Sequence, residues 1–222
     1  YGANHKGEDR VKQAVSEFKP LDGKFRKNVI LQTKNGPLDF QPREPYSPVF
    51  DQIRETPNMV ELQITQEYLG QSKHLVYLAP MWKEFFQYIE PDWLAGIAGV
   101  ANIGKDANWC GHHFSQANWY AFGRLAWNPD LTSEQIAREW LEQTFSTDEN
   151  FVFLMSTVME ESREACVSYM MPLGLHHIFK FDHHYGPEPD GFKKEYPIEW
   201  CPVYYHQADK DGVGFHRSST GT

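Results

Sequence analysis

The spacing of apolar residues predicts one helix and three strands in the first half of the chain. Between residues 8 and 19 the apolar side chains recur every three or four positions, which predicts an amphipathic helix. Residues 28–33, NVILQT, are a continuous apolar run, typical of a parallel strand covered on both faces. Residues 59–68, MVELQITQEY, alternate apolar and polar side chains and predict a second strand that ends at Glu67. The small residues of AGIAGVANIG, 95–104, predict a third strand where other backbone comes close.

Helical spacing returns between and after these strands. Four prolines between residues 41 and 58 exclude a long helix there, although residues 49–54 can form a short one. Pro80 can begin a helix that continues through MWKEFFQYI, and residues 115–127 predict another helix. The order is helix, strand, short helix, strand, helix, strand, helix. It predicts repeated βα units around a parallel sheet.

Beyond Asn128 the pattern becomes helical throughout. Thr132 and Gln135 have the spacing of a capping box at the start of a helix, and residues 150–170 predict a second, longer helix. From Pro172 onward the chain is loop-like and rich in His, Tyr, Gly and Pro. We therefore expect an α/β fold in two parts, with βα units in residues 1–128 and a mainly helical region in residues 129–222.

Charge and composition narrow the class of protein. The 222 residues carry a net charge of −9, which argues against nucleic acid or an anionic membrane as partner. No apolar run approaches the roughly 20 residues of a membrane span, so we expect a soluble protein and leave its compartment open between cytoplasm and periplasm. The three cysteines have neither metal-ligand spacing nor the spacing of a disulfide framework, and we expect buried thiols.

Two carboxylates follow predicted strands, where parallel α/β proteins place their working residues. Asp39 comes after the first strand, past an Asn-Gly-Pro turn, and Glu67 ends the second strand. Neighbouring strands lie about 4.8 Å apart, so both acids can face one small cavity, as in glycoside hydrolysis. Lys34, five residues before Asp39, could hold a ligand group and keep nearby carboxylates ionised. The alternative is that Asp39 is a turn residue and Glu67 a solvated strand end. Arg43 and Glu44, in QPREP, are expected to form a structural ion pair or a loop anchor.

The histidines raise the alternative of a metal site. Three pairs are adjacent in sequence, at residues 112–113, 176–177 and 183–184. Adjacent residues on a regular element point in different directions, and the chain has no H-E-x-x-H motif. We therefore expect neither a metal nor a cofactor, and we assign these residues to polar packing or substrate contact. The segment DHHYGPEPDG, 182–191, is polar, aromatic and rich in turns, which fits a loop lining a pocket.

Longer motifs resemble a known family. FKPLDGKFRKNVILQTKNGPLDFQPREPYSPVF, ELQITQEYLGQSKHLVYLAPMWKE, GIAGVANIG, NWCGHHFSQANWYAFGRLAWNPDLT, HHYGPEPDG and YYHQADKDGVGFHRSSTGT together resemble glycoside hydrolase family 67, the α-glucuronidases. The resemblance covers nearly the whole chain. It implies the last strands of a (β/α)8 TIM-type barrel, followed by part of a helical C-terminal domain. It also implies inverting removal of glucuronic acid, or its 4-O-methyl form, from xylo-oligosaccharides during xylan breakdown.

The resemblance assigns roles to four residues. Asp39 and Glu67 match the two acids from which the family draws its catalytic base, and which of them is the formal base stays open. Lys34 matches the lysine that contacts the sugar, and Trp200 is the candidate for a tryptophan of the sugar pocket. The partner expected on this basis is a glucuronic-acid-substituted xylo-oligosaccharide.

The resemblance also implies residues that this chain does not contain. In the family the general acid and the cationic clamp on the uronate carboxylate lie upstream of the matched motifs. We therefore expect this chain alone to lack the general acid. The alternative function is a non-catalytic carbohydrate-binding or assembly fragment that needs the other half of the barrel. A homodimer of the full-length protein stays open.

Overall fold

The computed structural model describes residues 8, 10–70, 73–109, 111–171, 180, 188–207, 209–212 and 214. The elements, in chain order, are α1 (Arg10–Phe18), η1 (Lys19–Leu21), β1 (Leu31–Lys34), α2 (Val49–Gln52), β2 (Asn58–Gln63), α3 (Ala79–Tyr88), η2 (Pro91–Trp93), β3 (Ile97–Val100), α4 (Ser115–Trp127), α5 (Ser133–Thr144), α6 (Glu149–Met170), η4 (Ile198–Trp200) and α7 (Pro202–His206). This is a mixed α/β fold with a small parallel sheet, as the alternating pattern predicts.

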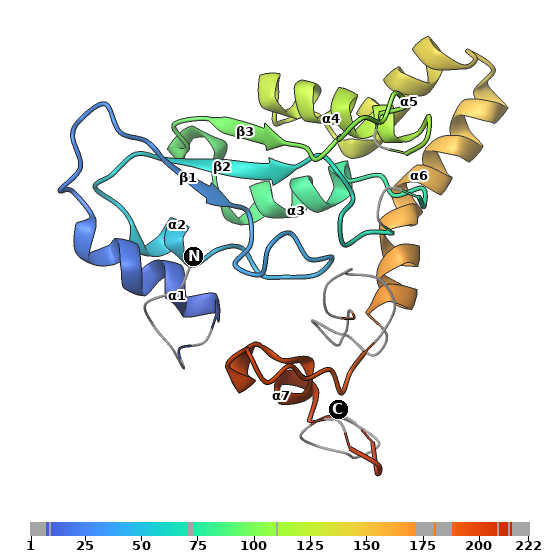
Figure 1. Ribbon diagram of the computed structural model, residues 1–222. Helices are drawn as coiled ribbons and strands as arrows, with labels where there is room; N and C mark the ends of the chain where they lie inside the picture. The colour runs from blue at the N-terminus through green and yellow to red at the C-terminus, as the bar shows by residue number, and fades with distance from the viewer. Residues whose placement is uncertain are drawn as a thin grey trace.

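The sheet has three parallel strands in the order β1-β2-β3 (Figure 1). Leu31 pairs with Asn58, and Val60 pairs with Ile97, so β2 lies between the other two strands. Val60 and Leu62 of β2 are completely buried. Burial of an aliphatic side chain contributes about 1.5–3 kcal/mol, which makes β2 the strand most firmly held by the core.

Helices pack against the sheet and against one another. In Figure 1, α3 lies along one side of the sheet and α1 lies near α2 beside β1. A Cβ atom added to Gly99 of β3 would lie 2.7 Å from the ring of Phe122 in α4, so only glycine allows this close approach. The rings of Phe122 and Trp82 meet edge to face at 6.2 Å between centroids, which joins α4 to α3. The small residues predicted for β3 therefore serve close packing.

The helices beyond residue 128 share the same core. The Thr132 hydroxyl accepts a hydrogen bond from the backbone N–H of Gln135, and the Gln135 side-chain oxygen accepts one from the backbone N–H of Thr132, so the predicted capping box is confirmed. Ile136 and Leu141 of α5 belong to one buried cluster with Leu62 of β2. The long α6 then runs from α5 toward the C-terminal segment (Figure 1). Cys166 and Cys201 are buried free thiols, as expected.

Two details of the predicted strands are wrong. The first strand begins at Leu31 and is only partly buried, with Ile30 47% exposed, because β1 pairs with β2 alone among the described residues. The second strand ends at Gln63, four residues before Glu67. The chain turns after Ile64 because the buried Gln66 side chain donates to the carbonyls of Leu69 and His74. Glu67 therefore lies in a turn and does not end the strand.

Over the part of the chain that the structure describes, no helix combines the length and the apolar composition needed to cross a bilayer.

Candidate active site

The segment from residue 35 to residue 47, here called the Asp39 loop, follows β1 directly. Asn35 extends the β1–β2 ladder, since its N–H donates to Glu61 at 3.1 Å. The loop closes where the N–H of Ser47 donates to the carbonyl of Asn35 at 2.8 Å. The loop thus begins and ends at one point, next to the last residue of β1, Lys34.

Lys34 and Asp39 form an ion pair at the mouth of this loop, with side chains 23% and 35% exposed. The hydroxyl of Tyr68, from the turn after β2, donates to the second oxygen of Asp39 at 3.2 Å. The Lys34 ammonium also lies 4.8 Å from the centroid of the Phe40 ring. The structure therefore brings Lys34 and Asp39 together, and it adds Tyr68, which the sequence analysis missed.

Glu67 lies next to Tyr68 in the same turn and is half-buried. Its carboxylate accepts a hydrogen bond from the Gln63 side chain at 2.9 Å. Tyr68 therefore connects the Asp39 loop to the turn that carries Glu67.

Trp200 ends η4, but its side chain lies outside the described residues. The histidines at 176, 177, 183, 184 and 216 also fall outside them, as do residues 182–187 of the predicted pocket loop at 182–191. Among the residues that are described, no group of three or more His, Cys, Asp or Glu side chains lies close enough to hold a metal.

Glu44 has a place in the Asp39 loop that the sequence analysis foresaw only in part. Arg43 and Glu44 are predicted to form a structural ion pair or a loop anchor. Arg43 instead pairs with Glu164 of α6, whereas Glu44 accepts a hydrogen bond from the backbone N–H of Leu38. The loop-anchor interpretation is therefore confirmed for Glu44.

The carboxyl of Glu44 is buried inside the loop. The residue as a whole is half-buried, but its Oε1 atom has almost no solvent contact. Burial is the main influence on this group and raises its pKa to about 8. Hydrogen bonds from backbone N–H groups oppose the rise, and the negative charge of Asp39 adds to it. Glu44 therefore keeps its proton at neutral pH.

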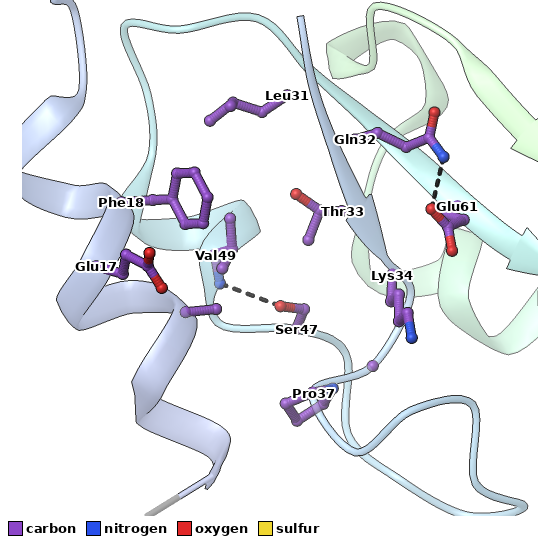
Figure 2. A pocket seen from close by; sticks show the side chains of 12 residues that line it. Glu17, Phe18, Leu31, Gln32, Thr33, Lys34, Pro37, Ser47, Val49 and Glu61 are labelled. Atoms are coloured by element: carbon purple, nitrogen blue, oxygen red, sulfur yellow. Dashed lines mark hydrogen bonds between the residues drawn. The ribbon is translucent and has the colours of Figure 1, made fainter. Parts of the chain in front are cut away.

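Two cavities adjoin the loop. The first, of about 250 Å³, lies between α1 and β1 and is shown in Figure 2, where Lys34 and Glu61 supply charge and Phe18 and Leu31 supply apolar surface. Gln32 donates to Glu61 there. The second, of about 350 Å³, lies behind the loop. Its polar lining comes from Asn35, Gln41, Glu44, Tyr46, Glu84, Tyr88 and Arg163.

Models of known protein families match the whole chain in two consecutive segments. Residues 1–109 match a model described as "Glycosyl hydrolase family 67 middle domain". Residues 110–222 match "Glycosyl hydrolase family 67 C-terminus".

Curated proteins match over most of the chain. "Alpha-glucuronidase A" of Emericella nidulans is 40% identical over an alignment of 229 positions that covers 95% of this chain and 26% of the relative. "Probable alpha-glucuronidase A" of Aspergillus clavatus is 38% identical, over 95% of this chain and 27% of the relative. The protein of that name from Aspergillus fumigatus is 42% identical over 82% of this chain and 24% of the relative. The chain thus spans about a quarter of the length of the curated relatives it matches.

Proposed function

Because the chain belongs to glycosyl hydrolase family 67, we propose that it forms part of an α-glucuronidase. The reaction is the inverting hydrolysis of the α-1,2 bond between glucuronic acid, or its 4-O-methyl form, and a xylo-oligosaccharide. The names of the relatives support the activity. The observation that carries the proposal is the partly exposed Asp39 carboxylate, which Lys34 contacts from the end of β1 and Tyr68 contacts from the turn after the adjacent strand β2.

The proposed architecture is the closing part of a (β/α)8 barrel. Three parallel strands with helices between them are what such a barrel repeats, and its active site lies at the carboxyl ends of the strands. Lys34 and the Asp39 loop follow that end of β1, and Glu67 follows that end of β2. Residues 129–222 belong, in this proposal, to a helical C-terminal domain.

In the proposed mechanism Asp39 and Glu67 orient a water molecule and remove its proton as the water attacks the anomeric carbon. The general acid stands opposite and protonates the leaving oxygen, with about 6.5–9.5 Å between the carboxyls of an inverting pair. Lys34 contacts the sugar beside Asp39, and Trp200 contributes to the sugar pocket.

The experiment uses a protein of the relatives' length that contains this chain. Asp39→Ala and Glu67→Ala should each lower kcat for glucuronic acid release by about 10²–10⁴-fold, the usual contribution of a general base, and leave the circular dichroism spectrum unchanged. Asp130→Ala is the matched control, because Asp130 is an exposed acid in the turn between α4 and α5, outside the Asp39 loop. A variant of Asp39 or Glu67 with kcat within about threefold of the parent would remove that residue from the mechanism. Binding of the oligosaccharide without any release by the parent protein would favour the non-catalytic alternative.

A further inference from the structure

The Asp39 loop has an unusual backbone. Asp39 and Phe40 are consecutive non-glycine residues with φ angles of +71° and +65°, in the left-handed region. Each such residue costs roughly 1–2 kcal/mol, so some other interaction must hold the backbone in this conformation.

Glu44 supplies that interaction from inside the loop. Its carboxyl accepts a hydrogen bond from the N–H of Leu38, and the N–H groups of Gln41 and Phe40 lie near it and favour its charged form. Successive N–H groups that point inward around left-handed residues form a concave site for an oxygen ligand. The Glu44 carboxyl fills that site, so the strained turn and the buried side chain stabilise each other.

Gly36 leaves the space that the Glu44 carboxyl occupies. A Cβ atom added to Gly36 would lie 2.2 Å from the Glu44 carboxyl carbon, so the carboxyl rests directly on the Gly36 backbone. Any other residue at position 36 would displace Glu44. The glycine of the Asn-Gly-Pro turn therefore makes room for the side chain that organises the loop.

The direction of Asp39 depends on this backbone. Asp39 follows Leu38, whose N–H donates to Glu44, and precedes Phe40, whose N–H lies near the same carboxyl, while the Asp39 carboxylate turns outward to Lys34 and Tyr68. A change in the φ angle of Asp39 would swing its carboxylate away from both partners.

We propose that Glu44 is a positioning residue for Asp39. By binding the N–H of Leu38, directly before Asp39, Glu44 holds the left-handed turn and directs the Asp39 carboxylate toward the reacting water. The proposal rests on the proposed function of Asp39. Its consequence is that removal of Glu44 should impair the chemical step more than sugar binding, because Lys34 belongs to β1 and keeps its place.

The test compares Glu44→Ala and Glu44→Gln in a protein of the relatives' length. Glu44→Ala should lower kcat about 100-fold, the loss that a misplacement of about 1 Å can cause, while the Kd for glucuronic acid, from calorimetry, stays within about threefold. Glu44→Gln keeps an oxygen that can accept from Leu38 and should keep kcat within about threefold of the parent. Glu164→Ala is the control, because it removes the exposed ion pair between Glu164 and Arg43 of the same loop. It should leave kcat and the Kd for glucuronic acid unchanged.

A double-mutant cycle separates positioning of Asp39 from a general structural effect. If Glu44 acts through Asp39, Glu44→Ala should lower the residual kcat of an Asp39→Ala protein by less than about twofold, because the aimed carboxylate is already gone. Equal losses in both backgrounds, or full activity in Glu44→Ala, would overturn the proposal. Equal loss in Glu44→Gln and Glu44→Ala would also overturn it. Full activity of Asp39→Ala by itself would instead overturn the proposed function.

Discussion

Replacing Glu44 by Gln should abolish a pH dependence in the opening of the Asp39 loop. The Glu44 carboxyl is sealed in the closed loop, and burial raises its pKa to about 8 from an ordinary value of 4.5. Between these two values the closed loop holds a proton that the open loop releases. The closed state is therefore favoured most below pH 4.5, and this advantage is lost as the pH rises toward 8.

The expected magnitude is large enough to measure. One pKa unit corresponds to about 1.4 kcal/mol, or a tenfold change in an equilibrium constant. The population of the open loop should therefore rise about tenfold for each pH unit within this window, and about 100-fold between pH 5 and pH 7. In Glu44→Gln the side chain does not titrate, so the same population should stay nearly constant.

Comparison of the two proteins isolates Glu44 from the other charges nearby. Asp39 is the nearest titratable neighbour of Glu44, and the other titratable side chains that face either of them are Lys34, Tyr46, Tyr68, Glu84, Tyr88 and Arg163. They come from β1, the turn after β2, α3, α6 and the loop itself, and all of them are the same in the variant. Any pH dependence that they cause should therefore appear equally in both proteins.

The assay is amide hydrogen exchange on peptides that cover residues 35–47, followed by mass spectrometry from pH 5 to pH 8. After correction for the intrinsic exchange rate, the protection factor reports the free energy of local opening. The reasoning would be refuted by a protection factor in the parent protein that does not change with pH. It would be refuted equally by a slope in Glu44→Gln as steep as that of the parent.

Three other changes have expected outcomes. Arg163→Met should destabilise the protein by about 2 kcal/mol, because the buried guanidinium bonds to Glu84 at 2.7 Å and to the Pro42 carbonyl at 3.3 Å. Calorimetry measures this loss, and Arg138→Met, which removes an ion pair with an exposed carboxylate, is the control that should be less destabilised. Thr132→Ala should cost about 1 kcal/mol through loss of the capping box of α5, and Thr132→Ser should recover most of it in denaturant unfolding. Exhaustive treatment with EDTA should leave glucuronic acid release unchanged, because two carboxylates suffice for inverting hydrolysis; activity lost and then restored by zinc would contradict this.

Local patterns in the sequence predicted most of the elements correctly. The alternating apolar positions of β2 and the capping residues of α5 act within a few residues of chain, so a sequence window contains all the information that they need. The short helix α2 likewise follows from the prolines around it, which leave room for a single turn. The ion pair between Lys34 and Asp39 was predictable because five residues and a tight turn separate them.

Features decided by distant contacts were not predictable in this way. The exposure of β1 depends on which strands flank it. Because an apolar run has the same sequence pattern at the edge of a sheet as at its centre, the sequence does not distinguish the two positions. Glu67 leaves the strand because the Gln66 side chain binds the carbonyl of His74, which is eight residues away. The burial of Glu44 depends on the loop folding back on itself, and an acid between two prolines carries no sign of that.

The Asp39 loop depends on both parts of the chain. Arg163 belongs to α6, within the segment that matches the C-terminal model of the family, yet it donates to the carbonyl of Pro42 in the loop. Glu84 of α3 completes the connection, because Arg163 bonds to it across the cavity behind the loop. A carboxylate that must activate one water molecule needs a rigid support, and rigidity comes from elements packed against each other on both sides of the loop. We therefore regard the helical region as part of the support of the proposed active site. Its buried Arg163 bonds to the loop backbone at Pro42, and Glu44 bonds to the loop backbone at Leu38.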